Sequence, residues 1–92
     1  MTFNYGEPIS VELSEYLKDF TDTQSIADVS TKTGISISTL KYLKLRTNSV
    51  TENNEVGIIE LMKIAIKNAE NNIHRATQCK KDLSEILDEH ES

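Results

Sequence analysis

Residues 28–43 read DVSTKTGISISTLKYL, and this stretch combines a helix end, a tight turn and a helix start. Gly34 supplies the positive φ that the C-terminus of a helix often requires. Ser36 is a good N-cap for a following helix, because its hydroxyl can accept a backbone N–H two or three residues further on. Leu40 and Leu43 then recur at helical spacing. The stretch therefore predicts two short helices locked together around a tight turn.

The same residues resemble a known DNA-binding motif, the helix-turn-helix of phage repressors and Cro-like proteins. The positions that carry this resemblance are Val29, Ser30, Gly34, Ile35, Ser36, Thr39, Leu40 and Leu43. Residues 33–42, TGISISTLKY, are also similar to the opening of the mercury-resistance-regulator family. In that resemblance Lys41 stands where the family has a helix arginine, and Tyr42 matches its first tyrosine. Both resemblances imply a head whose recognition helix enters the major groove of DNA.

The outward face of this third helix, expected at about residues 37–46, holds the candidate DNA-binding residues. If Leu40 and Leu43 face the core, the opposite surface can meet base edges, thymine methyl groups and phosphates. The candidates are Ser36, Ile37, Ser38, Lys41, Tyr42, Lys44 and Arg46. The alternative is that Ile37 and Leu45 are apolar because another helix or a protein partner covers them.

The charge distribution favours the same face. The formal net charge is −5, which argues against a protein that coats nucleic acid generally. Six acidic and two basic residues precede residue 41, whereas residues 41–50 contain three basic residues and no acidic one. We therefore expect DNA contact at the third helix, with the acidic remainder repelling DNA elsewhere.

Helical patterns flank this stretch on both sides. Apolar residues between 13 and 20 recur at i, i+3, i+4 and i+7, which predicts an amphipathic helix over about residues 10–20. Thr21 with Gln24 fits a capping box for the second helix. The polar residues 47–54 predict a loop.

From residue 55 helix formers continue almost to the end of the chain, and no glycine or proline follows Gly57. The first turns predict a broad apolar face toward the head, comprising Ile58, Ile59, Leu61, Met62, Ala65 and Ile66. A helix of roughly 30 residues would be about 45 Å long and would project beyond so small a head. The alternative is a break near residues 71–72, with the last helix folded back.

Beyond this face the apolar positions narrow to a heptad seam. The seam comprises Met62, Ala65, Ala69, Asn72, Ala76, Cys79, Leu83 and Ile86, beside an off-register Ile73. Its alanines make it too weak to stand alone, so a second copy across a two-fold axis is the expected partner. The candidate dimerisation residues are Ala69, Ala76, Cys79, Leu83 and Ile86.

The 92 residues predict one all-α structural domain. Residues 1–50 form a three-helix head with an N-terminal arm, and residues 51–92 form the long helix. No apolar run is long enough to cross a bilayer, and the first residues do not resemble a signal peptide. The single Cys79 excludes an internal disulfide framework and favours a reducing, cytoplasmic compartment.

The sequence offers little for catalysis or cofactor binding. His74 and Cys79 are five residues apart, which does not stack them on one helix face, so we expect no metal site. Carboxylate pairs such as Glu12 with Glu15 lie on exposed faces, and no glycine-rich phosphate loop is present. We therefore expect neither an enzyme nor a bound cofactor.

These observations predict a sequence-specific, homodimeric protein for double-stranded DNA, a small transcriptional regulator of phage or mobile-element origin. Half-sites about 10 base pairs apart, or a multiple of this, would follow from two-fold symmetry. Control would come from concentration or from a regulatory protein partner. One alternative is a protein–protein adaptor, such as an antirepressor or a phage assembly component. Another is a DNA-packaging or recombination accessory that uses the same motif.

Overall fold

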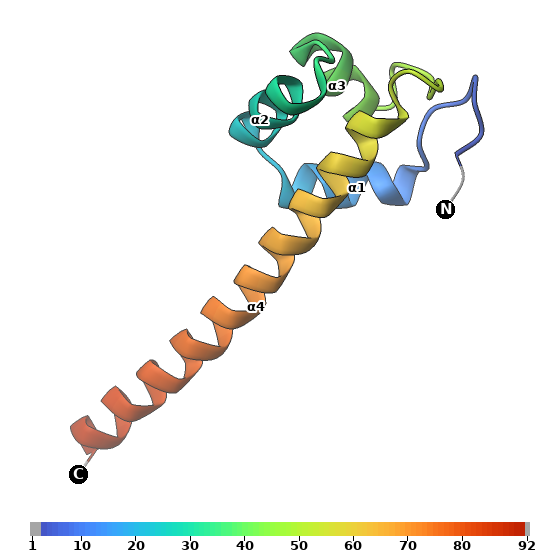
Figure 1. Cartoon of the computed structure of the whole chain (residues 1–92). Coiled ribbons are helices and arrows are strands. Elements are labelled where there is room, and N and C mark those ends of the chain that lie inside the picture. Colours follow the sequence, from blue (N-terminus) through green and yellow to red (C-terminus); the bar gives the residue numbers. More distant parts are fainter. Residues whose placement is uncertain (1–2, 92) are drawn as a thin grey trace.

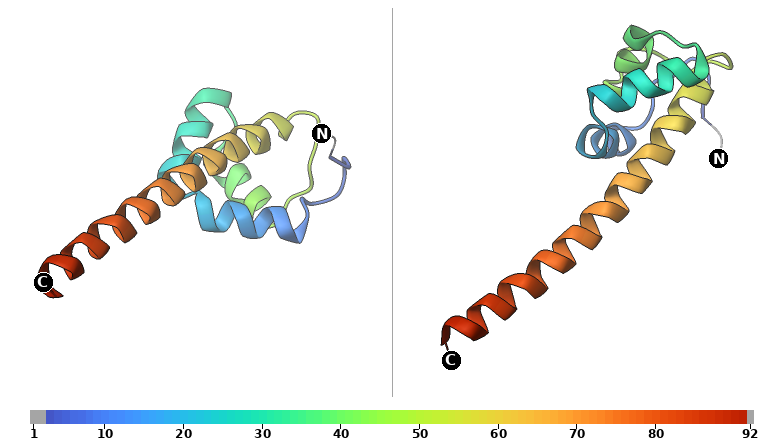
Figure 2. Two further views of the ribbon diagram at one scale, coloured as in Figure 1. Left: turned by 90° about the horizontal axis from the view of Figure 1, so that it is seen from below. Right: turned by 60° about the vertical axis from the view of Figure 1, so that its left-hand side comes forward.

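A computed structural model describes residues 3–91 of the chain (Figure 1). This part contains four helices and no strand: Val11–Phe20 (α1), Thr23–Thr33 (α2), Ile37–Lys44 (α3) and Glu55–Glu91 (α4). The predicted all-α class is therefore confirmed. Helices α1 to α3 pack around the first turns of α4, and the rest of α4 projects from this head (Figures 1 and 2).

The helix starts follow from local side-chain caps. Ser10 caps α1, and its hydroxyl accepts the Leu13 backbone N–H at 3.1 Å. The capping box predicted for Thr21 and Gln24 is wrong, because Asp22 is the N-cap of α2 and accepts the Ser25 N–H at 2.8 Å. Thr21 is instead buried, and its hydroxyl donates to the last turn of α1.

The turn between α2 and α3 forms as predicted. Gly34 adopts φ 77°, and its N–H donates to the Ser30 carbonyl at 2.8 Å to close α2. The Ser30 hydroxyl donates to the Ile35 carbonyl at 2.6 Å, which fixes the middle of the turn. Ser36 then caps α3 by accepting the Thr39 N–H at 3.1 Å. Helix α3 ends at Lys44, slightly before the predicted end.

The core of the head draws on all four helices, the arm and the loop. Its ten buried apolar side chains are Ile9, Leu17, Ile26, Val29, Leu40, Leu43, Val50, Ile58, Leu61 and Ala65. Full burial of a valine, leucine or isoleucine side chain stabilises a fold by roughly 1.5–3 kcal/mol. The broad apolar face predicted for α4 is too wide, because Ile59 and Ile66 are 38% and 58% exposed. The head packs against one side of α4 only, so the apolar residues on the other side of the helix stay exposed.

The N-terminal arm and the loop before α4 hold each other in place. Gly6 donates its N–H to the Val50 carbonyl at 2.9 Å, and Val50 donates to the Glu7 carbonyl at 2.8 Å. Val50 and Ile9 are both buried, so each segment contributes an apolar anchor to the core. The predicted loop at residues 47–54 is confirmed, since it contains neither helix nor strand.

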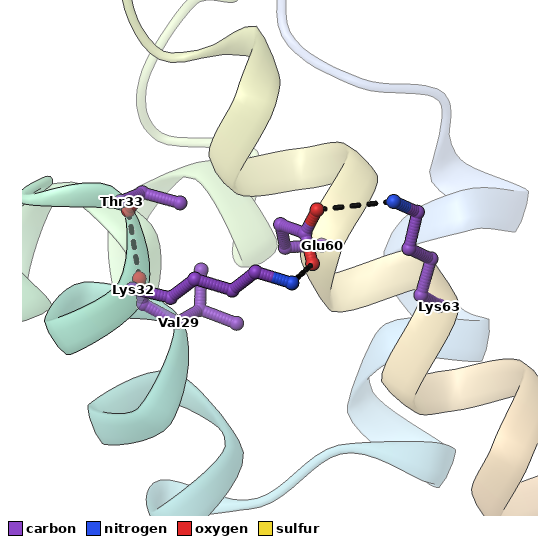
Figure 3. A network of polar contacts seen from close by, with 5 residues as sticks. All are labelled: Val29, Lys32, Thr33, Glu60 and Lys63. Atoms are coloured by element: carbon purple, nitrogen blue, oxygen red, sulfur yellow. Dashed lines mark hydrogen bonds and ion pairs between the residues drawn. The ribbon is translucent and has the colours of Figure 1, made fainter.

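An ion-pair network joins α2 to α4 (Figure 3). The Glu60 carboxylate accepts hydrogen bonds from Lys32 on α2 at 2.8 Å and from Lys63 on α4 at 3.1 Å. These two bonds hold the pKa of the Glu60 carboxyl below its usual range. The network thus links the surface of α4 to the helix that precedes the turn.

Helix α4 is continuous through residues 71–72, so the predicted alternative of a folded-back last helix is wrong. Its 37 residues make it about 55 Å long at 1.5 Å per residue. Every side chain from residue 70 to residue 89 is exposed. Within the described part of the chain, no helix is long and apolar enough to cross a membrane.

Candidate nucleic-acid interface

Helix α3 separates a buried side from a side open to solvent. Leu40 and Leu43 are fully buried beneath it. On the opposite side Ile37 is 51% exposed and Tyr42 is 47% exposed, and Lys41 lies beside them in solvent. No other described element covers this face. Helix α3 is thus held in the core by one face, and its opposite face is exposed and accessible to a binding partner.

The polar groups of this face are available for new bonds. Ser38 and Lys41 are three residues apart on α3, and Ser38 and Tyr42 are four apart, so all three share one surface. Within residues 3–89 their side chains make no hydrogen bond or ion pair. One ammonium and two hydroxyl groups are thus presented together to solvent.

Ser36 belongs to the same surface but already has a role within the chain. Its hydroxyl caps α3 and also donates to the Thr39 hydroxyl at 2.8 Å. Any contact of Ser36 with a ligand would have to share this capping geometry.

Lys44 acts as a clamp between α3 and the α1–α2 connection. Its ammonium donates to the Thr21 carbonyl at 3.2 Å, and the buried Ser14 hydroxyl donates to the Lys44 carbonyl at 2.7 Å. Burial lowers the pKa of Lys44, and the nearby Asp22 carboxylate opposes that shift. Lys44 follows the buried Leu40 by one helical turn, and this spacing is the sequence signal that indicates the inner side of α3, although Lys44 was predicted as a DNA-binding residue.

Arg46 closes the C-terminal end of α3. It adopts φ 65°, which costs a residue other than glycine roughly 1–2 kcal/mol. Its guanidinium Nε donates to the Ile9 carbonyl at 2.7 Å, and the following Thr47 N–H donates to the Tyr42 carbonyl at 2.9 Å. Of the three basic residues in this segment, Lys41 alone has an ammonium or guanidinium with no partner among the described residues.

A shallow hollow between α2 and α3 extends the face in a way that sequence reasoning missed. It is lined by Thr23, Ile26, Ile37, Lys41, Lys44 and Leu45. Thr23 and Ile26 come from the first turn of α2, so only the packing of α2 on α3 brings them to this surface. The lining is mainly apolar, and two lysines contribute to it.

The predicted dimerisation residues lie along α4. Ala69 is half-buried, and Ala76, Cys79, Leu83 and Ile86 are exposed. Ala65 is 9% exposed and packs into the head, so it does not belong to an outward seam. The residue after it, Ile66, faces outward instead.

Neither a metal site among the described residues nor similarity to known proteins identifies a function for this chain. Among the described residues, no group of three or more His, Cys, Asp and Glu side chains could hold a metal ion. Comparison with protein-family models, curated proteins and solved structures finds no match for this chain. Its function must therefore be inferred from the geometry and charge of its own surfaces.

Proposed function

We propose that the protein binds double-stranded DNA sequence-specifically, as a small homodimeric transcriptional regulator in which α2, the turn and α3 act as a helix-turn-helix. The observation that carries this proposal is the bare outer face of α3, where Lys41 and Tyr42 stand in solvent over a fully buried inner face. The segment 41–50 has no acidic residue, so nothing in it opposes a phosphate backbone.

The side chains on this face match the groups of a major groove, which is wide enough to admit an α-helix. Ser38 and Lys41 are suited to base edges, and the Ile37 side chain is suited to a thymine methyl group. The Tyr42 hydroxyl is suited to a phosphate, and phosphate contacts set the register of a protein on the duplex. Lys44 and Arg46 act mainly by fixing the angle and the end of α3, since both are bonded to backbone carbonyls.

The acidic balance of the chain limits how much of it touches DNA. With roughly 3–5 phosphate contacts per subunit, the logarithm of the binding constant should fall with the logarithm of salt at about −3 to −4.5 per subunit. A dimer should double this slope. Acidic surface elsewhere should direct the approach and suppress non-specific binding.

The proposal is tested with duplexes selected by the protein from a random pool. Lys41→Ala should weaken binding to the selected duplex by about 5-fold to 150-fold, because a good base contact contributes about 1–3 kcal/mol. Lys81→Ala removes the same charge from the exposed half of α4 and should leave binding unchanged. Both variants should keep the helical spectrum and unfolding midpoint of the parent. Equal affinity of Lys41→Ala and the parent would remove α3 as the recognition element.

A second candidate, a protein–protein adaptor, is favoured by one observation. Ile26, Ile37 and Leu45 give the hollow between α2 and α3 apolar walls, which suit an aliphatic side chain of a protein partner. The two functions differ in their response to salt. Salt-dependent binding to random duplex DNA supports the regulator, and absence of any such binding supports the adaptor.

A further inference from the structure

The projecting half of α4 carries an exposed apolar stripe in heptad spacing. One set of heptad positions holds Ile66, Ile73 and Leu87, which are 58%, 69% and 57% exposed. The other set holds Ala69, Ala76 and Leu83, which lie three residues after positions 66, 73 and 80 of the first set. Alternating steps of three and four residues are the pattern by which two helices pack side by side. This stripe keeps Ala69, Ala76 and Leu83 of the predicted seam, and it replaces the set through the buried Ala65 by the set one residue further on.

We propose that two copies of the chain associate through α4 in antiparallel orientation, with Ile73 of each copy packed on Ala76 of the other. The inference takes the homodimer from the proposed function, but DNA plays no part in it. Because the two chains run in opposite directions, each residue of the Ile66–Ile73 set packs on a residue of the Ala69–Ala76 set of the other copy. The remaining layers are then Met62 with Leu87, Ile66 with Leu83, and Ala69 with Lys80.

The sizes of the side chains favour this orientation. In the antiparallel pair each alanine lies opposite a long side chain, so the two helices keep a uniform separation and fill the space between them. A parallel pair in register would place Ile73 on its own copy and Ala76 on its own copy. Wide and narrow layers would then alternate and leave gaps at the alanines.

Lys80 distinguishes the two orientations by its charge. It occupies a heptad position inside the stripe. A parallel pair would bring the two Lys80 ammonium groups together in a partly desolvated layer, where like charges repel strongly. In the antiparallel pair Lys80 crosses the small Ala69, so its stem can cover the seam while its ammonium reaches water.

An apolar groove between α1 and α4 continues the stripe into the head. It is lined by Leu13, Tyr16 and Phe20 of α1 and by Met62, Ile66 and Ala69 of α4, and it encloses about 320 Å³. The antiparallel pair brings the C-terminal turns of the other copy to this groove. Ile86, which is 59% exposed, flanks the stripe on the side where Ala65 meets the head, so it would lie against α1 of the other copy.

The charges along α4 agree with this placement. Residues 82–89 contain four acidic residues and no basic one. The antiparallel pair lays this acidic end along residues 60–67 of the other copy, where the exposed Lys63 and Lys67 outnumber the one acidic residue, Glu60. A parallel pair would place the two acidic ends side by side, and they would repel each other.

Disulfide cross-linking tests the orientation directly. Two single-cysteine chains are made in a Cys79→Ser background, one with Ala69→Cys and one with Lys80→Cys. Each is oxidised alone and then in an equal mixture, without DNA. We expect the mixture to give a dimer with the mass of one chain of each kind, and each chain alone to stay uncross-linked. A disulfide between two Ala69→Cys chains, or no cross-link in the mixture, would overturn the antiparallel pair.

Sedimentation of the full chain tests the stripe independently of cysteine chemistry. Ile73→Asp should weaken dimerisation at least tenfold while leaving the head folded, because the Ile73 side chain is 69% exposed in the single copy and lies outside the core of the head. Asn71→Asp adds the same charge on the opposite side of the helix and should leave the dimer intact. A monomeric parent chain, or equal dimerisation of both variants, would sink the inference. Lys41→Ala should remain a dimer, so a failure of DNA binding and a failure of self-association are read separately.

Discussion

Residues 55–69 of α4 pack against α1, α2 and α3, whereas residues 70–89 of the same helix are exposed on every side. Both halves carry aliphatic residues at helical spacing. In the first half Ile58 and Leu61 are fully buried, and in the second half Leu83 and Ile86 are 55% and 59% exposed. The periodicity of a sequence thus identifies a helix face that needs cover, but the surrounding fold decides whether the same chain supplies that cover.

Removing the same side chain from each half should give the largest contrast. Leu61→Ala should lower the free energy of unfolding of the head by about 2–5 kcal/mol, because it opens a cavity in a fully packed core. Leu83→Ala should leave the stability of the single copy nearly unchanged. Urea titrations at concentrations below dimerisation measure both values. Similar losses in the two variants would show that the second half is covered within one molecule.

Alanine substitutions of Gly57 in the packed half and of Asn71 in the exposed half should have opposite effects on stability. Gly57 lies where α4 meets α3, and a Cβ there would lie 2.5 Å from Leu40 Cδ2 and 2.9 Å from Ile35 Cδ1. Overpacking of up to about 3 kcal/mol should exceed the helix-propensity gain of about 1 kcal/mol, for a net loss near 2 kcal/mol. Asn71→Ala should stabilise the exposed half slightly. Thermal unfolding with circular dichroism measures both, and a more stable Gly57→Ala chain would contradict the close approach.

Two asparagines locate the boundary between the halves. The Asn68 side chain donates to the Phe20 carbonyl at 2.8 Å, and among the described residues no hydrogen bond joins α4 to the head beyond this point. Asn68→Ala should cost about 1 kcal/mol, the usual net contribution of one such bond. Asn72→Ala, one turn further on, gains the same helix propensity and loses no bond. Equal unfolding midpoints of the two variants would move the boundary toward the N-terminus of α4.

The smallest effect concerns acid sensitivity. Because Lys32 and Lys63 lower the folded-state pKa of Glu60, its contribution to stability is present above its usual value of 4.5 and is lost as pH falls through the folded-state value. Glu60→Gln should therefore make the fall in stability below this pH less steep. Adding Lys32→Met to that variant should change the pH profile little further. Unfolding midpoints measured from pH 6 to acid test this, and an unchanged slope would contradict the network in Figure 3.

The sequence predicted the features that depend on neighbours within one helical turn. Gly34 and Ser36 form the turn between α2 and α3, and the burial of Leu40 and Leu43 leaves the predicted face of α3 open. The unbroken length of α4 follows from its composition after Gly57.

Features that depend on contacts between distant segments were not predictable in this way. The bonds of Lys44 to Thr21 and of Arg46 to Ile9 join segments 23 and 37 residues apart, so no local pattern identifies the partners of these two cations. The hollow beside α3 likewise requires α2 to be in place. Similarly, the burial of Ala65 against α1, rather than in a seam, depends on how the head rotates α4.

The length of α4 also sets the distance between the two heads in the proposed dimer. Helix α4 begins beside α3, where Gly57 faces Leu40 and Ile35. About 19 residues separate this start from the two-fold axis of the proposed antiparallel pair, so the two heads of that pair would lie about 60 Å apart at 1.5 Å per residue. That span is nearer to two turns of B-DNA than to the single turn of about 34–36 Å that links half-sites of compact dimers. If the proposed dimer binds DNA as proposed, its operator is expected to be a widely spaced inverted repeat, and inserting one heptad in α4 should lengthen the preferred spacer.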